Sequence, residues 1–228
     1  GSRDGSINAV GGFLVHGDAS GGGNSSASFT IDTSLQILAS DVSAGDWFGS
    51  SVAIDGNYAL VGANKNHISI IADAGSAYLY KFSESGNGLS IDNSYRILAS
   101  DRAANDWFGK SVAINGNYAL VGARGNDEGG SMTGSAYLYK FSENNNVLSI
   151  DNSFRILASD RATYDYFGWS VAINGSYALV GAWGNDEGGS TAGSAYLYKF
   201  SESGNASFTI DNSYKILASD GDAGDKFG

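Results

Sequence analysis

The sequence contains no cysteine and no proline, and it has only two histidines and one methionine. Without cysteine there is no disulfide framework, no thiol chemistry and no redox indication of a cellular compartment. No apolar run approaches the roughly 18 residues of a membrane-spanning helix, so we expect no membrane insertion. No signal peptide is visible, and Gly1-Ser2 resembles the remnant of a cloning site. The sequence also lacks GxSxG, Walker and HExxH motifs, so we expect no enzyme and no catalytic residue.

Basic residues are scarce as well. Thirteen Lys and Arg stand against 24 Asp and Glu, which gives a formal net charge of −11. Such a chain repels phosphate backbones and anionic membranes, so nucleic acid is not expected as a partner. Cations, basic partners and neutral sugars remain open, and the acidity could also serve solubility alone.

What the chain does have is glycine, aromatic residues and a long repeat. Asp46-Trp47-Phe48-Gly49 recurs at positions 106–109, 165–168 and 225–228, with Tyr166 and Lys226 in place of the tryptophan in the last two copies. Successive copies are 60, 59 and 60 residues apart. The segment Ile-Leu-Ala-Ser-Asp recurs at the same spacing, beginning at residues 37, 97, 156 and 216. A period of this length indicates a repeated supersecondary unit.

Each repeat reads as four strands. In the second repeat they are predicted at Ser111–Ile114, Tyr118–Ala123, Ser135–Phe141 and Leu148–Ala158. Asn115-Gly116 separates the first two, and Asn-Gly between apolar runs is a strong hairpin signal because both central residues accept positive φ. No segment shows sustained helical periodicity.

Four-stranded units of this kind predict an all-β fold, a β-propeller-like array of antiparallel blades. A β-solenoid or stacked hairpins are the alternatives. The expected units are a degenerate, partial N-terminal blade at 1–45, blades at 46–105, 106–164 and 165–224, and the stub of a next blade at 225–228.

Three complete blades fall short of the four to eight that usually close a propeller. An incomplete ring leaves apolar blade faces and sheet edges open. Three solutions remain open: a small four-bladed ring, a ring shared by two chains as a homo-oligomer, or an open fragment of a longer protein.

The segment Phe108–Ile114, followed by Tyr118–Ala123, resembles the FG-GAP repeat of integrin α-subunits and bacterial surface proteins. Gly125–Gly130 and Gly134–Tyr139 extend the resemblance to a bacterial variant, and the similarity covers about residues 46–220. It implies a non-catalytic adhesion or binding module, extracellular or at the cell surface, with a protein or glycan partner. A glycan-binding lectin and a part of a larger enzyme or assembly scaffold are the alternatives.

Acidic loops indicate Ca²⁺ as a candidate cofactor. The loop after the second strand and the connection between units should share one face of the array. The metal candidates are Asp127, Glu128, Asp186 and Glu187, although adjacent acids form a poor Ca²⁺ cage. The Ca²⁺ loop that integrin-like repeats carry between their first two strands is replaced here by an Asn-Gly turn. Paired Asp residues in the connections read better as acceptors for loop N–H groups.

Aromatic residues beside these loops are the candidate ligand contacts. They could stack on sugar rings, as in a lectin with one site per blade, or they could pack between blades. Two of the tryptophans occupy positions that hold Lys110 and Arg124 in the second repeat, and residues that break a repeat are candidates for a specific contact. The tentative ligand-binding set is Trp47, Trp107, Tyr166, Trp169, Trp183 and Arg124.

Overall fold

A computed structural model describes residues 31–39, 41, 43–86, 88–203 and 207–228. These residues form twelve strands in three four-stranded antiparallel sheets, each in the order of the sequence, and they contain no helix. The first sheet has β1 (Phe48–Asp55), β2 (Tyr58–Ala63), β3 (Ser76–Ser85) and β4 (Gly88–Ile97). The second has β5 (Phe108–Asn115), β6 (Tyr118–Ala123), β7 (Ser135–Asn144) and β8 (Val147–Ile156). The third has β9 (Val171–Asn174), β10 (Tyr177–Ala182), β11 (Ser194–Glu202) and β12 (Phe208–Ile216). The all-β prediction and the four-stranded unit are confirmed.

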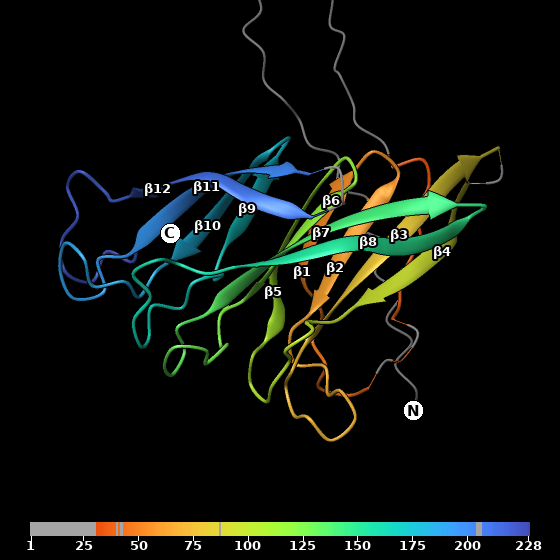
Figure 1. The fold of residues 1–228 in the computed structure, drawn as a ribbon. Helices are drawn as coiled ribbons and strands as arrows, with labels where there is room; N and C mark the ends of the chain where they lie inside the picture. Colours follow the sequence, from red (N-terminus) through yellow and green to blue (C-terminus); the bar gives the residue numbers. More distant parts are fainter. Residues whose placement is uncertain (1–30, 40, 42, 87, 204–206) are drawn as a thin grey trace, which may run out of the picture.

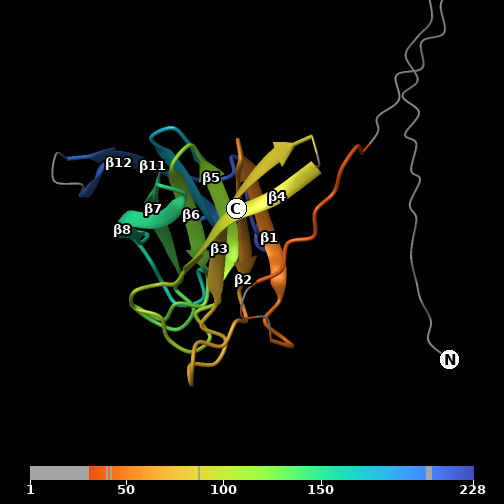
Figure 2. The ribbon, with the colours of Figure 1, turned by 90° about the vertical axis from the view of Figure 1, so that its right-hand side faces the viewer.

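The three sheets are arranged as successive blades. Their first strands, β1, β5 and β9, lie near one another, while the fourth strands β4, β8 and β12 diverge (Figure 1). Turned by 90°, the second sheet is seen between the other two (Figure 2). The described residues form a fan of blades and do not close a ring.

Hydrophobic faces of neighbouring blades make the core. Leu60 and Leu79 of the first blade, both fully buried, pack against the second blade, where Phe108 is also fully buried. The Phe108 ring meets Tyr137 and Tyr139 edge-on, at centroid distances of 5.3 and 6.2 Å. Equivalent residues form a second cluster between the second and third blades. Each blade therefore needs a neighbour to bury its apolar face.

The Phe-Gly dipeptide forms the joint between blades. Gly109 has φ +87°, and a Cβ there would lie 2.3 Å from the Ser76 carbonyl oxygen of the preceding blade. The Gly109 carbonyl accepts a 2.8 Å hydrogen bond from Ser51 Oγ. Ser111 and Ser170 donate to the carbonyls of Gly168 and Gly228 in the same way. Only glycine allows the two backbones to approach this closely.

Segments at both ends of the described chain repeat this joint. Ile37 and Ala39 pack on the first blade, where Tyr80 Oη donates to the Leu38 carbonyl at 3.2 Å. At the other end, Phe227 N donates to the Ala192 carbonyl at 2.9 Å, as Phe108 N does to Ala74. The N-terminal blade predicted at 1–45 lies mostly outside the described residues, and those described between 31 and 45 form no strand.

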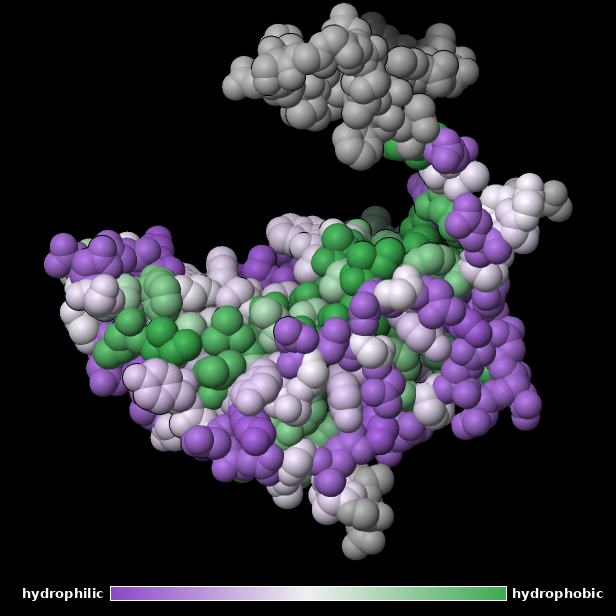
Figure 3. Space-filling view, turned by 90° about the horizontal axis from the view of Figure 1, so that it is seen from above, coloured by the Kyte–Doolittle hydropathy of each residue, from purple (hydrophilic) through white to green (hydrophobic). Residues whose placement is uncertain are grey.

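The outermost blades leave apolar surface uncovered. From above, hydrophobic residues form a band across the molecule (Figure 3). In the first blade Val52 is 70 % exposed, whereas Val112 at the equivalent position of the second blade is 8 % exposed. In the third blade Leu179 is 36 % exposed, whereas the equivalent Leu120 is fully buried. The two open faces are thus the two halves of the interface that joins the blades internally.

Candidate functional site

The molecule has two ends with different chemistry. The loop end carries the loops after the second strands (64–75, 124–134, 183–193) and the connections between blades (98–107, 157–166, 217–226). The prediction that these segments share a face is confirmed, because Asn105 N donates to the Ala72 carbonyl at 3.0 Å and Tyr164 N donates to the Ser131 carbonyl at 2.9 Å. The opposite, hairpin end carries the Asn-Gly and Asp-Gly turns.

The aspartates of the connections organise the loops. Asp106 is buried, and its carboxylate accepts a 2.6 Å hydrogen bond from Ala103 N. Asp46 and Asp165 accept from Ser43 N and Ala162 N at 2.9 and 2.7 Å. Burial raises the pKa of Asp106 to about 6, although its donors work in the opposite direction. These carboxyl groups stabilise the connections and leave little for a ligand.

The predicted metal candidates are engaged in similar ways. Asp127 and Asp186 accept hydrogen bonds from Met132 N and Thr191 N, both at 2.7 Å. Glu128 pairs with Arg155, and Glu187 pairs with Lys215 at 2.5 Å. In the part of the chain that the structure describes, no group of three or more His, Cys, Asp or Glu side chains converges on a point. Bonded in this way, the four acids fit a Ca²⁺ ion poorly.

The residue before Phe-Gly has a left-handed backbone in every repeat. Its φ is +57° at Trp47, +52° at Trp107, +55° at Tyr166 and +57° at Lys226. A bulky side chain in this region is strained, and strain of about 1–3 kcal/mol persists only where the surroundings enforce it. In the second repeat the left-handed turn is closed by a hydrogen bond that Lys110 N donates to the Trp107 carbonyl at 3.1 Å.

Three of these side chains, Trp107, Tyr166 and Lys226, form with their neighbours a continuous strip of rings and cations, called here the cation–aromatic strip. Arg124 Cζ lies 4.2 Å from the Trp107 ring centroid and 4.6 Å from that of Trp169 in the next blade. Tyr166 stacks on Trp183 at 4.9 Å with an interplanar angle of 6°. Besides these five, the strip contains Lys110, which lies 4.9 Å over Trp169, and Lys226, which lies 5.0 Å over Trp183.

The cations of the strip have no acidic partner among the described residues. Lys110, Arg124 and Lys226 form no ion pair there, whereas Lys81, Arg96, Lys140, Arg155 and Lys215 all do. Desolvation lowers the pKa of Lys110, and the nearby Arg124 lowers it further. Trp107 Nε1, Trp183 Nε1 and Arg124 Nε are buried without an acceptor in the described part of the chain. The strip therefore consists of donors and rings in a strongly acidic protein.

The structure brings five of the six predicted ligand contacts together and leaves one apart. Trp47 lies on the first blade, 57 % exposed, with Lys65 Nζ 4.1 Å over its ring. Sequence reasoning missed Lys110, Lys226 and the exposed Tyr164, whose ring lies 6.2 Å from Tyr166. Lys110 and Lys226 occupy repeat positions that hold tryptophan or tyrosine elsewhere, and that equivalence was the signal that could have found them.

Comparison with known proteins agrees with this architecture. The FG-GAP repeat family matches residues 34–80, 92–139 and 152–198. The second and third matches begin within the fourth strand of one blade, and all three end within the third strand of a blade. No curated protein matches the chain. In the described residues no helix has the length and apolarity to cross a membrane.

FG-GAP repeats occur in integrin-like binding modules, typically of extracellular proteins, and the family is generally non-catalytic. Here the Phe-Gly joint recurs at each blade boundary, and the three matched segments cover more than half of the sequence. The chain therefore belongs to the FG-GAP repeat family.

Proposed function

We propose that this chain is a non-catalytic binding module, extracellular or at the cell surface, that meets a protein or glycan partner at its loop end. We expect neither a nucleic acid partner nor insertion into a membrane. The observation that carries it is the cation–aromatic strip, where bulky side chains are held in a strained backbone conformation in successive blades. Strain retained at the same place in each repeat supports a contact surface there.

The chemistry of the strip indicates what the partner should carry. Several acids at this end are bonded internally, and the strip offers unpaired cations and buried N–H donors without acceptors. Two cations share the Trp169 ring although they repel each other. A carboxylate or another acceptor group of a partner would relieve that repulsion, so we expect the partner to be acidic.

Binding to an array of acidic and neutral glycans and to an immobilised set of acidic peptides tests this proposal. We expect an acidic probe to bind with an affinity that falls as salt rises. Arg124→Gln should weaken that binding at least about tenfold, the loss of one charge-assisted hydrogen bond. Lys199→Gln, at an exposed position of the mostly buried β11, is the matched control and should bind normally. Folded protein that ignores every acidic probe refutes the proposal.

A lectin with one site per blade is the second candidate at this end. Trp47 favours it, because this side chain is 57 % exposed even with Lys65 over one face of its ring. Trp107 and Tyr166 are covered by Arg124 and Trp183, so they do not offer equivalent stacking surfaces. A sugar whose binding is lost in Trp47→Ala but kept in Trp107→Ala would support a single site of this kind.

Ca²⁺ is the weaker proposal for the loops of Asp127 and Asp186, since both carboxylates already accept backbone hydrogen bonds. Thermal unfolding with and without millimolar CaCl₂ tests it. A Ca²⁺ ion that binds only the native state would raise the melting temperature, and an unchanged melting temperature would overturn this proposal.

A further inference from the structure

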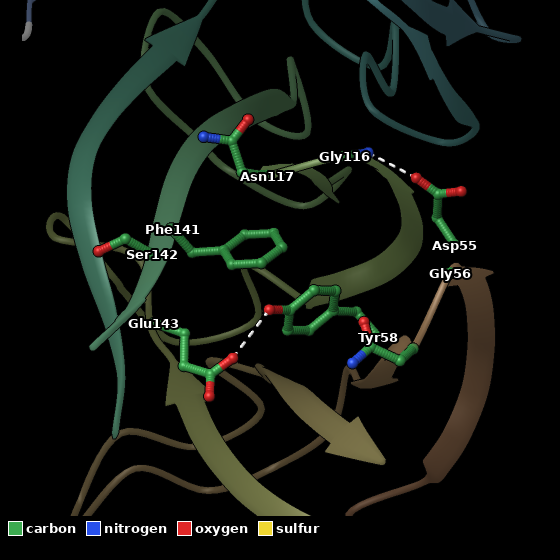
Figure 4. Close-up of a pocket in the computed structure, with 9 residues that line it drawn as sticks. Asp55, Gly56, Tyr58, Gly116, Asn117, Phe141, Ser142 and Glu143 are labelled. Carbon is green, nitrogen blue, oxygen red and sulfur yellow. Dashed lines mark hydrogen bonds between the residues drawn. The ribbon is translucent and has the colours of Figure 1, made fainter. Parts of the chain in front are cut away.

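The hairpin end carries a cleft at each junction between blades. The cleft between the first and second blades has a volume of about 470 Å³, within the range of about 300–1,000 Å³ that small-molecule sites occupy. Tyr58 and Asn57 line it from the first blade, and Asn117, Phe141 and Glu143 line it from the second (Figure 4).

The second junction repeats the first. Its cleft, about 380 Å³, is lined by Tyr118, Phe200 and Glu202, which follow Tyr58, Phe141 and Glu143 by one repeat. In both clefts the tyrosine ring meets the phenylalanine edge-on, at centroid distances of 5.1 and 5.3 Å. The two clefts therefore share the same arrangement of Tyr, Phe and Glu, whereas Lys199 and Asp211 line only the second.

A Lys–Glu ion pair fixes one carboxylate in each cleft, and Asp55 adds a second carboxylate to the first cleft, where it accepts a hydrogen bond from Gly116 N. Glu143 accepts a hydrogen bond from Tyr58 Oη at 3.1 Å (Figure 4). It also accepts one from Lys81 Nζ at 2.6 Å. Glu202 accepts from Lys140 Nζ at 2.5 Å, and its Oε1 atom is buried without a partner among the described residues. Each carboxylate keeps acceptor capacity beyond these bonds, since an ionised carboxylate has about four lone-pair sites.

Asn117 adds an exposed amide at the rim of the first cleft, and Ser176 adds a hydroxyl at the rim of the second. A partly open aromatic ring, a paired carboxylate and an amide or hydroxyl match the alternating apolar face and hydroxyl groups of a sugar ring. A charged ligand would disturb the balanced Lys–Glu pair, whereas a neutral one would not.

We propose that the two inter-blade clefts are equivalent binding sites for a neutral saccharide. This goes beyond the proposed function, which concerns the opposite end of the molecule. The stoichiometry follows from the fold: a cleft needs a tyrosine from one blade and Phe–Glu from the next. Tyr177 of the third blade, 48 % exposed, has no following blade among the described residues, so the chain should hold two sugars.

Saturation-transfer NMR with glucose, galactose, mannose, fucose and N-acetylglucosamine at millimolar concentration tests the proposal, followed by calorimetric titration of any sugar that binds. We expect at least one of them to bind with a stoichiometry of two. Glu143→Gln and Glu202→Gln should each remove one site, and Asn117→Ala should weaken one site about tenfold, equivalent to about 1.4 kcal/mol. Asn117→Ala leaves the Lys81–Glu143 pair intact, so it still tests the first site if the Glu variants fail to fold.

Two controls separate this proposal from the other one. Tyr177→Ala, at the equivalent position without a following blade, should bind sugar normally, and so should Trp47→Ala at the loop end. The proposal is overturned if no sugar gives saturation transfer, if the double Glu variant still binds two sugars, or if Trp47→Ala abolishes binding.

Discussion

At the scale of single residues, Phe108 and its counterparts connect the repeat signature to stability. The ring of Phe108 is fully buried and packs edge-on to two tyrosines. Phe108→Ala should lower the free energy of unfolding by about 3–5 kcal/mol, because a cavity replaces a large aromatic side chain. Tyr214→Ala, at a site 69 % exposed, should change it by less than about 0.5 kcal/mol. Chemical denaturation measures both, and equal losses would contradict the assignment of Phe108 to the core.

Asp106 should make stability depend on pH. Burial raises its pKa to about 6 in the folded protein, above the value of about 3.9 expected when unfolded. Asp101 and Asp127 add repulsion in the same direction. The folded state therefore holds this proton more tightly, so its contribution is complete below about pH 4 and is lost as the pH rises through about 6. We expect a loss of about 1–2 kcal/mol after screening is allowed for.

Unfolding of the wild type and of Asp106→Asn between pH 4 and 7 tests this prediction. The variant cannot ionise, so the difference in stability between the two proteins should change across this range. Asp220→Asn, on the exposed connection after β12, controls for general charge effects and should follow the wild type. A difference that stays constant with pH would show that Asp106 does not titrate there.

Single residues also show what the sequence can and cannot predict about the site. The position before Phe-Gly was identified from its recurrence, yet its left-handed backbone was not, since Trp and Tyr rarely adopt positive φ. Arg124 was singled out, but its place between Trp107 and Trp169 depends on how far one blade is rotated from the next. Periodicity within one repeat carries no information on that rotation.

At the scale of elements, substitutions of two glycines distinguish the cost of a left-handed backbone from the cost of a steric clash. Gly116 has φ +55° in a hairpin turn, and a Cβ there would meet nothing within 4 Å. Gly116→Ala should therefore cost about 1–2 kcal/mol through the left-handed conformation alone. Gly109→Ala has the same conformational cost and also drives a Cβ into the Ser76 carbonyl, so it should cost about 1–3 kcal/mol more.

Denaturation midpoints of the two variants decide between the effects. Similar losses of stability would mean that the joint between blades opens without penalty and that Gly109 is retained for its backbone conformation only.

The observed strands lie close to the predicted ones: β6 spans Tyr118–Ala123 as predicted. β5 begins three residues earlier than predicted, because the Phe-Gly bulge still pairs Phe108 with Ala123 before the register shifts.

At the scale of the whole molecule, the number of blades decides how the chain behaves in solution. Repeat composition correctly indicated three complete blades, but closure depends on geometry that a sequence period does not contain. The open face of the first blade and that of the third are complementary, since the same two faces meet inside the molecule. We therefore propose that chains associate head to tail at high concentration, with the third blade of one chain against the first blade of the next, as in a ring shared by several chains.

This association should be weak. The segments 37–49 and 216–228 are the same part of the repeat. When one chain docks on another, the segment 216–228 of the first chain and the segment 37–49 of the second would occupy the same position, so one of them must be displaced. Displacing the segment that ends at Phe227 breaks its hydrogen bond to Ala192. That loss offsets part of the free energy gained when association buries Val52 and Leu179. Sedimentation should therefore show an average mass that rises with concentration and no stable closed oligomer at low concentration.

Lysine substitutions at equivalent positions of two blades test this association. Val52→Lys places a charge on an open face and should abolish the rise in mass while changing the free energy of unfolding by less than about 0.5 kcal/mol. Val112→Lys places the same charge in the closed interface and should destabilise the fold by several kcal/mol, because a buried unpaired ammonium is costly. If Val52→Lys proves as destabilising as Val112→Lys, the face of the first blade is covered within the chain itself. If it is neutral and the mass still rises, the chains associate through another surface.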